Sequence, residues 1–209
     1  MGNKVISEAV VKRLPRYYRY LEHLEQEGVT KVSSGSLARL LGVTASQVRQ
    51  DFCNFGGFGQ HGYGYDVSYL KGKLAEILGL DRQYDMIIIG AGNIGRALAG
   101  YKSFAAEGFK VRALFDIEVR EPRIGDIPVY NIEKLSDYVK ENGCDIAVIA
   151  TQKSVASDVA NQLVALGVKS LWNFAPIDLE VPDDVSVENI AMSESLYVLS
   201  YRMKNKNKN

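Results

Sequence analysis

A glycine-rich turn near the middle of the chain carries the clearest chemical signal. The residues Gly90-Ala91-Gly92-Asn93-Ile94-Gly95 have the spacing G-x-G-x-x-G, follow the apolar run Met86–Ile89 directly and open a predicted helix. Such a turn suits a dinucleotide, because its glycines leave room for the pyrophosphate and the helix N-terminus offers backbone N–H groups to the phosphates. Asp116 ends the next predicted strand, where a carboxylate accepts hydrogen bonds from the adenosine ribose and repels a 2′-phosphate. The pattern therefore predicts a site for NAD(H) rather than NADP(H).

No set of catalytic residues accompanies this turn. Both histidines, His23 and His61, lie in the first third of the sequence, so we predict no histidine-based proton relay beside the coenzyme. The chain that follows the turn is also short for a separate substrate domain. We therefore predict binding without catalysis and name no catalytic residue. Two alternatives stay open, an NAD-dependent oxidoreductase with a small helical appendage and a regulator that binds coenzyme A at the same turn.

A second pattern, in the first third of the chain, is typical of DNA recognition. The predicted helices Ser36–Leu41 and Ala45–Asn54 are joined by a turn at Gly42-Val43. They have the dimensions of a helix-turn-helix whose second helix enters the major groove. On that helix Arg49 can contact guanine through two hydrogen bonds, and Gln47 or Gln50 can pair with adenine. Phosphates would be met by the basic side chains of the first predicted helix, which are Lys12, Arg13, Arg16 and Arg19. The alternative is a three-helix packing module with a solvated polar face.

A glycine and aromatic segment, residues 55–65, follows the second helix. It places five glycines in nine positions, which excludes a helix and suits a tight β-hairpin. Beside a helix-turn-helix, such a hairpin would be a wing whose glycines let the backbone approach the duplex.

The elements that position these residues change character after residue 80. Helices are predicted at 6–27 (interrupted at Pro15), 36–41, 45–54 and 67–78, and then short apolar strands begin to alternate with helices. The predicted strands are Met86–Ile89, Val111–Phe115, Ile146–Ala150, Ser170–Phe174 and Val185–Ile190. The helices between them are Gly95–Glu107, Ile132–Asn142 and Val155–Leu166, and a last helix, Met192–Met203, precedes Asn-Lys repeats that we predict to be disordered. The fold class is therefore α/β, a winged helix-turn-helix followed by a Rossmann-like doubly wound parallel sheet.

Composition and charge set limits on the function. The chain has 209 residues and a formal net charge of zero, but residues 1–80 carry ten Lys and Arg against seven Asp and Glu, whereas residues 81–199 carry eleven against eighteen. A basic first third beside an acidic remainder indicates two functions in one chain. The two cysteines, Cys53 and Cys144, have no metal-ligand spacing, so we predict no metal site. No apolar run approaches the ~20 residues of a membrane helix and no signal segment is evident, so we expect a cytoplasmic protein without a membrane partner.

The combined pattern resembles the Rex-type redox-sensing transcriptional repressors of bacteria. The resemblance covers nearly the whole chain and lies in segments 13–19, 33–38, 47–52 and 55–65, in the glycine turn, in Asp116, and in Asn173-Phe174-Ala175-Pro176. It implies a winged-helix domain at 1–80, an NAD(H)-binding Rossmann domain at 81–190, and a C-terminal helix and tail at 191–209 that is swapped between two subunits. It also implies a homodimer that represses genes on a palindromic double-stranded operator while the NADH/NAD⁺ ratio is low and releases that DNA when NADH binds.

The resemblance also assigns roles to individual residues. It places DNA contacts on the recognition helix and near His61 in the wing, and it places Tyr101 in a switch with Arg19. Two positions depart from the family pattern: His61 stands where an arginine is common, and Ala191 stands where an acid is common, so that Glu194 would have to substitute for it. The predicted coenzyme site is Gly90, Ala91, Gly92, Asn93, Ile94, Gly95, Tyr101, Asp116, Thr151, Phe174, Ala175 and Pro176. The predicted DNA site is Lys12, Arg13, Arg16, Arg19, Ser46, Gln47, Arg49, Gln50, Gln60 and His61.

Overall fold

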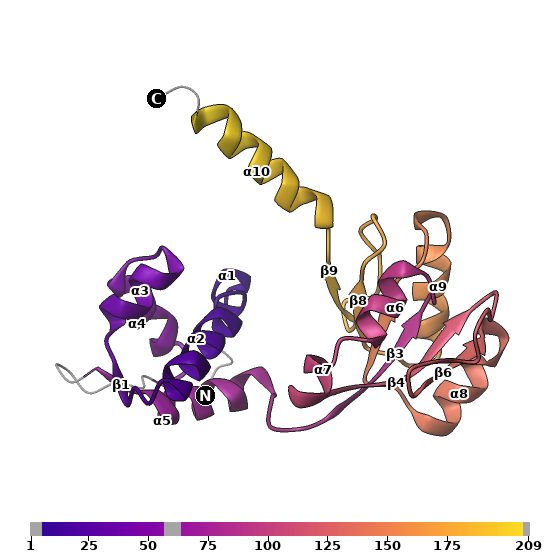
Figure 1. Ribbon diagram of the computed structural model, residues 1–209, viewed down its shortest axis with the longest axis horizontal. Helices are drawn as coiled ribbons and strands as arrows, with labels where there is room; N and C mark the ends of the chain where they lie inside the picture. Colours follow the sequence, from indigo (N-terminus) through magenta and orange to yellow (C-terminus); the bar gives the residue numbers. More distant parts are fainter. Residues whose placement is uncertain (1–5, 57–63, 207–209) are drawn as a thin grey trace. The chain divides into compact units, whose positions relative to one another are not determined.

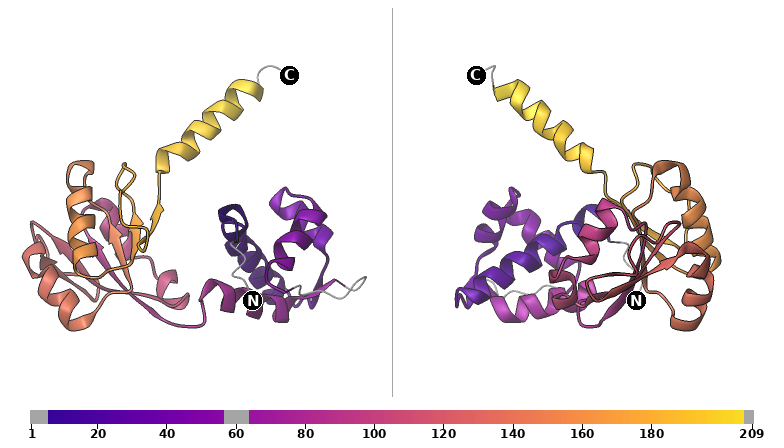
Figure 2. Two further views of the ribbon diagram at one scale, coloured as in Figure 1. Left: turned by 180° about the vertical axis from the view of Figure 1, so that it is seen from behind. Right: turned by 45° about the vertical axis from the view of Figure 1, so that its right-hand side comes forward.

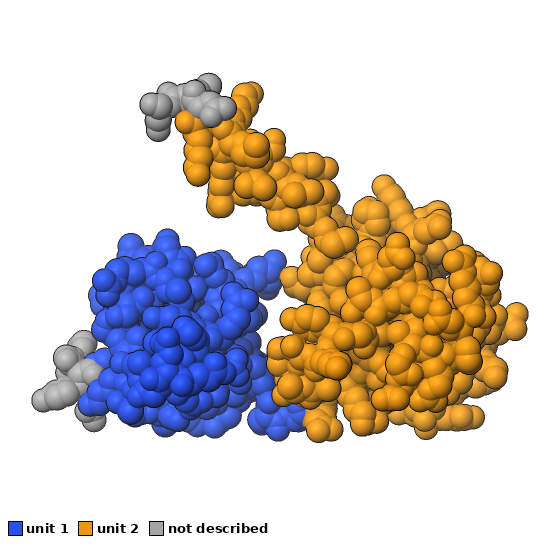
Figure 3. All heavy atoms as spheres, in the orientation of Figure 1, with its two compact units in different colours: residues 1–82 blue, residues 83–209 orange. Residues whose placement is uncertain are grey.

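The chain folds into two compact units. The computed structural model describes residues 6–56 and 64–206, and it divides the chain into residues 1–82 and residues 83–209 (Figure 3). No helix in the described part of the chain is long and apolar enough to cross a membrane.

Unit 1 is built from helices and one pair of very short strands (Figure 1). Its elements are α1 (Glu8–Val11), α2 (Leu14–Gln26), β1 (Lys31–Val32), α3 (Ser34–Leu41), α4 (Ala45–Cys53), β2 (Tyr65–Asp66) and α5 (Val67–Leu78). The expected single helix over 6–27 is in fact two helices, and the break falls just before Pro15, which lies in the first turn of α2. Proline is favoured there because the first helical N–H groups have no intrahelical acceptor.

The helix-turn-helix has the local signals that the sequence predicted. Ser33 Oγ accepts a hydrogen bond from the backbone N–H of Ser36 at 3.0 Å, which caps α3, and Thr44 Oγ1 accepts one from the N–H of Gln47 at 3.1 Å, which caps α4. Between the two helices Gly42 adopts a left-handed conformation with φ of +68°, so the chain turns without strain. The second helix therefore starts where the sequence predicted.

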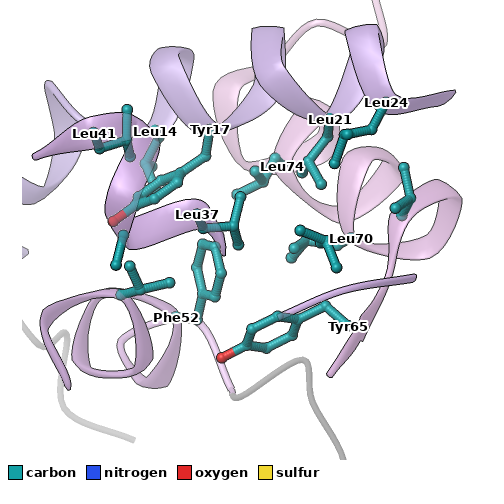
Figure 4. Close-up of a cluster of buried hydrophobic side chains, with 14 of the residues drawn as sticks. Leu14, Tyr17, Leu21, Leu24, Leu37, Leu41, Phe52, Tyr65, Leu70 and Leu74 are labelled. Carbon is teal, nitrogen blue, oxygen red and sulfur yellow. The ribbon is translucent and has the colours of Figure 1, made fainter. Parts of the chain in front are cut away.

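The core of unit 1 lies between α2, α3, α4 and α5. Figure 4 shows leucines from α2, α3 and α5 pointing into one interior together with three aromatic rings. The Phe52 ring is central, because its centroid lies 5.0 Å from that of Tyr17 and 5.2 Å from that of Tyr65. Phe52 and Tyr17 are thus structural.

Most of the predicted hairpin over 55–65 lies outside the described residues, so the hairpin stays a prediction. The strand that follows it, Tyr65–Asp66, pairs in antiparallel fashion with Lys31–Val32. The close approach of these two strands needs a glycine at position 64, since a Cβ there would lie 2.7 Å from the carbonyl oxygen of Val32. Residues 57–63, including the expected DNA contacts Gln60 and His61, lie outside the described residues.

Unit 2 contains a seven-stranded sheet in the order β5-β6-β4-β3-β7-β8-β9. All neighbouring strands are parallel except β5 and β6, which form an antiparallel edge pair. The strands are β3 (Tyr84–Ile89), β4 (Phe109–Asp116), β5 (Arg123–Ile124), β6 (Ile127–Asn131), β7 (Ile146–Ile149), β8 (Ser170–Asn173) and β9 (Ser186–Asn189). The doubly wound parallel sheet that the sequence predicted is therefore confirmed.

Helices cover both faces of this sheet (Figure 2). On one face Ile87 and Ile89 pack with α8 (Leu135–Asn142) and α9 (Lys153–Ala165), and on the other Ile88 packs with α6 (Asn93–Ala99). The chain order reverses at β3, whose neighbours are β4 and β7. In open sheets of this kind, ligands bind at that reversal, beyond the carboxyl ends of the strands.

Several predicted elements of unit 2 differ from those observed. The helix expected over Gly95–Glu107 is interrupted, because α6 ends at Ala99 and a separate short helix, α7 (Ser103–Ala106), follows. The edge pair β5 and β6 was not predicted. A 3₁₀ turn, Ile132–Lys134, precedes α8, and the last helix, α10 (Met192–Lys206), continues into the Asn-Lys repeats that were expected to be disordered.

Candidate coenzyme site and DNA-binding face

The glycine turn lies at the point where the order of the strands reverses. Gly90 follows β3 with φ of +104°, and a Cβ at this position would lie 2.6 Å from the carbonyl oxygen of Ala150, so only glycine fits between the ends of β3 and β7. A Cβ on Gly95 would collide with the carbonyl oxygen of Gly90. At Gly92, by contrast, nothing lies within 4 Å of an added Cβ. Two of the glycines therefore allow close packing, and the third leaves open space in which a pyrophosphate fits.

Asp116 lies at the carboxyl end of β4 and reaches the same turn. Its Oδ2 accepts a hydrogen bond of 2.6 Å from the backbone N–H of Ala91, and its Oδ1 accepts one of 3.1 Å from the N–H of Glu118. The carboxylate is thus held beside the turn by two backbone donors. Each oxygen keeps lone-pair capacity for a further donor, such as a ribose hydroxyl.

A cavity of about 320 Å³ opens beside Asp116 and contains residues that the sequence analysis did not single out. Arg96 donates from Nε to the carbonyl oxygen of Ala91 at 3.0 Å and pairs through Nη1 with Glu121 at 3.3 Å. Ile117 also lines this cavity and is 81% exposed, which leaves an apolar side chain free to contact a flat ring. The only available signal was proximity to the glycine turn and to Asp116, which does not tell a wall residue from a solvated one.

The other end of the predicted site is formed by the ends of β7 and β8. The Oγ1 of Thr151 is buried and has no hydrogen-bond partner among the described residues, so a polar group is available there for a ligand. Asn173 is fully buried and fixes the segment after β8, because its Nδ2 donates to the carbonyl oxygen of Ile177 at 2.7 Å and its Oδ1 accepts from the N–H of Ala175 at 3.0 Å. Asn173 thereby orients Phe174, Ala175 and Pro176.

Four aromatic rings form a cluster between the segment after α6 and the end of β8. Tyr101, which is 55% exposed in the break after α6, contacts Phe104 with a centroid distance of 4.7 Å. Phe104 contacts Trp172 at 5.6 Å, and Trp172 contacts Phe174 at 4.7 Å. The structure therefore brings Tyr101 and Phe174, both predicted for the coenzyme site, into one cluster, and Phe104 and Trp172 are the members that sequence reasoning missed.

Three residues of the predicted DNA site lie on one side of α4. Ser46, Arg49 and Gln50 are exposed and are three and four residues apart, so they share a helix face. Arg49 Nη1 donates to Ser34 Oγ at 3.2 Å, a contact that holds the guanidinium toward the start of α3. This face therefore offers the guanidinium N–H donors of Arg49 beside the amide group of Gln50 and the hydroxyl group of Ser46.

The basic residues of the first helices do not all share one environment. Lys12, Arg16 and Arg19 are exposed, as phosphate contacts would require. Arg13 differs, because its guanidinium binds the buried carboxylate of Asp51 with two hydrogen bonds of 2.7 Å. Gln47, which is half-buried, also donates to Asp51, at 2.9 Å. Two residues of the predicted DNA site, Arg13 and Gln47, are therefore hydrogen-bonded to a buried carboxylate.

The remaining chemistry of the described residues is sparse. No group of three or more potential metal ligands is found among them. Burial raises the pKa of the Cys144 thiol to about 12, so this thiol is a poor nucleophile at neutral pH. Glu194 lies on the first turn of α10 and its backbone N–H donates to the carbonyl oxygen of Ala191.

Two family models match separate parts of the chain. Residues 5–53 match the family described as "Putative DNA-binding protein N-terminus", and residues 81–177 match the family described as "CoA binding domain". The chain is 49% identical over 98% of its length to the redox-sensing transcriptional repressor Rex of Clostridioides difficile (strain 630), of which it covers 98%. It is 50% identical over 95% of its length to Rex of Thermoanaerobacter sp. (strain X514), of which it covers 90%. The chain belongs to the Rex family.

Solved Rex-family structures have the same fold. The crystal structure of RSP, a Rex-family repressor, matches with a TM-score of 0.91 and 46% identity over 98% of this chain and 97% of RSP. RSP in complex with β-NADH gives a TM-score of 0.90, and RSP in complex with β-NAD⁺ and operator DNA gives 0.91. The resemblance to Rex that the sequence motifs indicated is thus confirmed, and so is the predicted fold class.

Proposed function

We propose that this chain is a DNA-binding transcriptional repressor that senses the NADH/NAD⁺ ratio and releases its operator when NADH binds. The observation that carries this proposal is the pairing, in one Rex-family chain, of a dinucleotide turn with a helix-turn-helix in a separate unit. The turn leaves open space at Gly92 and has a carboxylate, Asp116, held beside it. No catalytic step is part of this function.

NAD(H) is the ligand that suits the cavity best. The glycine turn would hold the pyrophosphate, Asp116 would accept hydrogen bonds from the ribose, and the buried hydroxyl of Thr151 would meet a polar group at the other end. Arg96 and Arg120 also line the cavity, but both are paired with glutamates, Arg96 with Glu121 and Arg120 with Glu118. A 2′-phosphate would therefore meet paired arginines and a repelling carboxylate, which favours NAD(H) over NADP(H).

Discrimination between the two redox forms has an electrostatic basis. Oxidised nicotinamide is a cation and reduced nicotinamide is neutral, so an apolar pocket without a charged partner favours the reduced form. The apolar groups of Tyr101, Phe174, Ala175 and Pro176 would form that pocket. To move a conformational equilibrium from 1:99 to 99:1, the favoured ligand must bind one state better by about 5.5 kcal/mol.

The working unit is a homodimer on a palindromic operator. Helix α10 exposes Met192, Leu196, Leu199 and Met203 along one side and Tyr197 and Tyr201 on the other, and none of its residues is buried. A helix that is apolar on opposite sides needs cover on both, and a second copy of this chain would supply it. Two recognition helices would then read half-sites about 34 Å apart or a multiple of that spacing. Tyr101 and Arg19 would take part in the switch, and the protein would act in the cytoplasm.

A gel-shift assay on a Rex-type palindrome tests the proposal. We expect the protein to retard the operator alone and with NAD⁺, and to release it with NADH. A complex that persists at saturating NADH would refute the sensor assignment.

Coenzyme A is the second candidate ligand, because residues 81–177 match a CoA-binding family. It would be favoured if coenzyme A rather than NADH raised the melting temperature, and oxidation of NADH with carbonyl compounds would favour an oxidoreductase.

A further inference from the structure

A fully buried carboxylate lies behind the recognition helix. Asp51, on α4, has no exposed surface, and its two oxygens together receive four side-chain hydrogen bonds. Oδ2 accepts from Arg13 Nε at 2.7 Å and from the Tyr17 hydroxyl at 2.9 Å. Oδ1 accepts from Arg13 Nη2 at 2.7 Å and from Gln47 Nε2 at 2.9 Å. The four donors saturate this carboxylate on both sides.

The donors come from two different helices. Arg13 directly precedes α2 and Tyr17 lies in its first turn, whereas Gln47 lies one turn before Asp51 on α4 itself. The planar guanidinium meets the carboxylate through two parallel hydrogen bonds, a geometry that fixes both distance and orientation. The network therefore sets the rotation of α4 about its own axis relative to α2, and that rotation decides which side chains α4 presents to the groove.

The same carboxylate also fixes the side chain of Gln47. An amide group has two N–H donors and one carbonyl acceptor, and one of the donors is used by Asp51. One N–H and the carbonyl oxygen remain. These are the donor and acceptor that pair with N7 and N6 of adenine in the major groove.

We propose that Arg13 is a positioning residue for base recognition, which acts through Asp51 on Gln47 and α4, and is not one of the phosphate contacts. This inference rests on the proposed function, because it presumes that α4 reads the operator. The side chain of Arg13 is 20% exposed and its Nε and Nη2 are both used by Asp51. Arg16, three residues later, is exposed and remains a candidate phosphate contact.

Lysine substitutions at these two arginines separate the roles. A lysine keeps the positive charge that a phosphate needs but cannot form the two parallel hydrogen bonds of the guanidinium. We would measure the affinity of full-length Arg13→Lys and Arg16→Lys for a Rex-type palindrome and for a scrambled duplex, by fluorescence anisotropy over a series of KCl concentrations. We expect Arg13→Lys to weaken palindrome binding by about tenfold to a hundredfold, the discrimination that one two-hydrogen-bond base contact supplies.

The controls distinguish positioning from phosphate binding. Arg13→Lys should leave binding to the scrambled duplex and its salt dependence unchanged, because neither depends on base recognition. Arg16→Lys should bind both duplexes nearly as the wild type does, whereas Arg16→Ala should weaken both equally and lower the salt slope by about one. Adenine-to-guanine changes across each half-site should show Arg13→Lys losing discrimination at the same position as Gln47→Ala.

Full operator affinity in Arg13→Lys would overturn the inference. Equal weakening on both duplexes with a smaller salt slope in Arg13→Ala would overturn it as well. Far-UV circular dichroism checks folding, and if Arg13→Lys is unfolded, Asp51→Asn takes its place with the same expected pattern. Loss of fold in both variants would mean that the network acts only on stability. If the wild type itself does not bind the palindrome, the proposed function fails and the inference fails with it.

Discussion

The backbone N–H of Ala91 donates a hydrogen bond of 2.6 Å to Oδ2 of Asp116. This contact joins the glycine turn after β3 to the acid at the end of β4. The two features are 25 residues apart in sequence, yet they form one structural unit. The acid that would hold the ribose therefore also keeps the turn in shape.

Asp116→Ala should weaken NADH binding, because it removes both the ribose acceptor and the support of the turn. Hydrogen bonds to charged groups are worth about 1.5–3 kcal/mol, so we expect roughly a tenfold to a hundredfold loss in a fluorescence titration. Asp116→Asn keeps an oxygen for the Ala91 N–H and removes the charge, so it should also reduce the discrimination against NADPH. Operator binding without coenzyme is the control and should persist in both variants. Unchanged NADH affinity would remove Asp116 from the site.

Arg49→Ala should abolish specific operator recognition and leave NADH binding intact. Arg49 is exposed on α4, and a guanine contact from it is worth about 1–3 kcal/mol. A gel shift on the palindrome and an NADH titration on the same preparation measure the two effects. Loss of both activities would indicate a folding defect instead of a lost base contact.

Trp172 is the single tryptophan of the chain, and its ring contacts that of Phe174 edge to face with a centroid distance of 4.7 Å. Tryptophan emission overlaps the absorption of NADH but not that of NAD⁺. We therefore expect NADH to quench Trp172 emission by energy transfer, with NADH emission rising in parallel. Trp172→Phe should bind NADH without this signal. Quenching by NAD⁺ to the same extent would show that the change comes from the protein and not from a nearby reduced ring.

The Asp51 network predicts a pH dependence of stability in unit 1. Burial acts to raise the pKa of the Asp51 carboxyl, but hydrogen bonds from Arg13, Gln47 and Tyr17 outweigh burial and hold that pKa below its ordinary value. The stabilisation is therefore present above the unfolded pKa of about 4 and is lost as the pH falls through the lower folded pKa. Urea unfolding of wild type and Asp51→Asn between about pH 2 and pH 6, a range that brackets the ordinary Asp pKa, should show a shallower pH dependence in the variant. Equal slopes would contradict the assignment.

A charge on the apolar side of α10 should prevent dimer formation. Leu199 is 52% exposed in the single chain and would be covered by the partner. We expect Leu199→Glu to be monomeric at micromolar concentration in sedimentation velocity, because an unpaired buried charge costs several kcal/mol. Lys204→Glu places the same side chain elsewhere on the helix and should remain dimeric. A wild-type monomer would refute the proposed assembly directly.

Local signals in the sequence predicted much of the fold. Ser33, Gly42 and Thr44 each act within a few residues, so the start and end of the helices beside them could be interpreted without a structure. The strands of the parallel sheet were found because both of their faces are buried, which produces nearly continuous apolar runs.

The features that were missed depend on distant partners. Arg13 looked like a phosphate contact because nothing near it in sequence reveals Asp51, which is 38 residues away. The edge strand Arg123–Ile124 has only two residues, so it lacked the apolar run that identified the other strands. The break at Gly100–Lys102 was overlooked because the flanking residues on both sides favour a helix, and the aromatic contacts of Phe104 with Trp172 could not be foreseen.

The separate hydrophobic cores of the two units have a genetic consequence. Side chains that fill the interior of residues 1–82 belong to one cluster, and those around the seven-stranded sheet belong to others. We therefore expect a substitution in one interior to destabilise mainly its own unit. A random mutant screen should yield two kinds of allele. Substitutions in the core before residue 83 should abolish repression, whereas substitutions around the glycine turn should repress the target genes constitutively, at any NADH/NAD⁺ ratio.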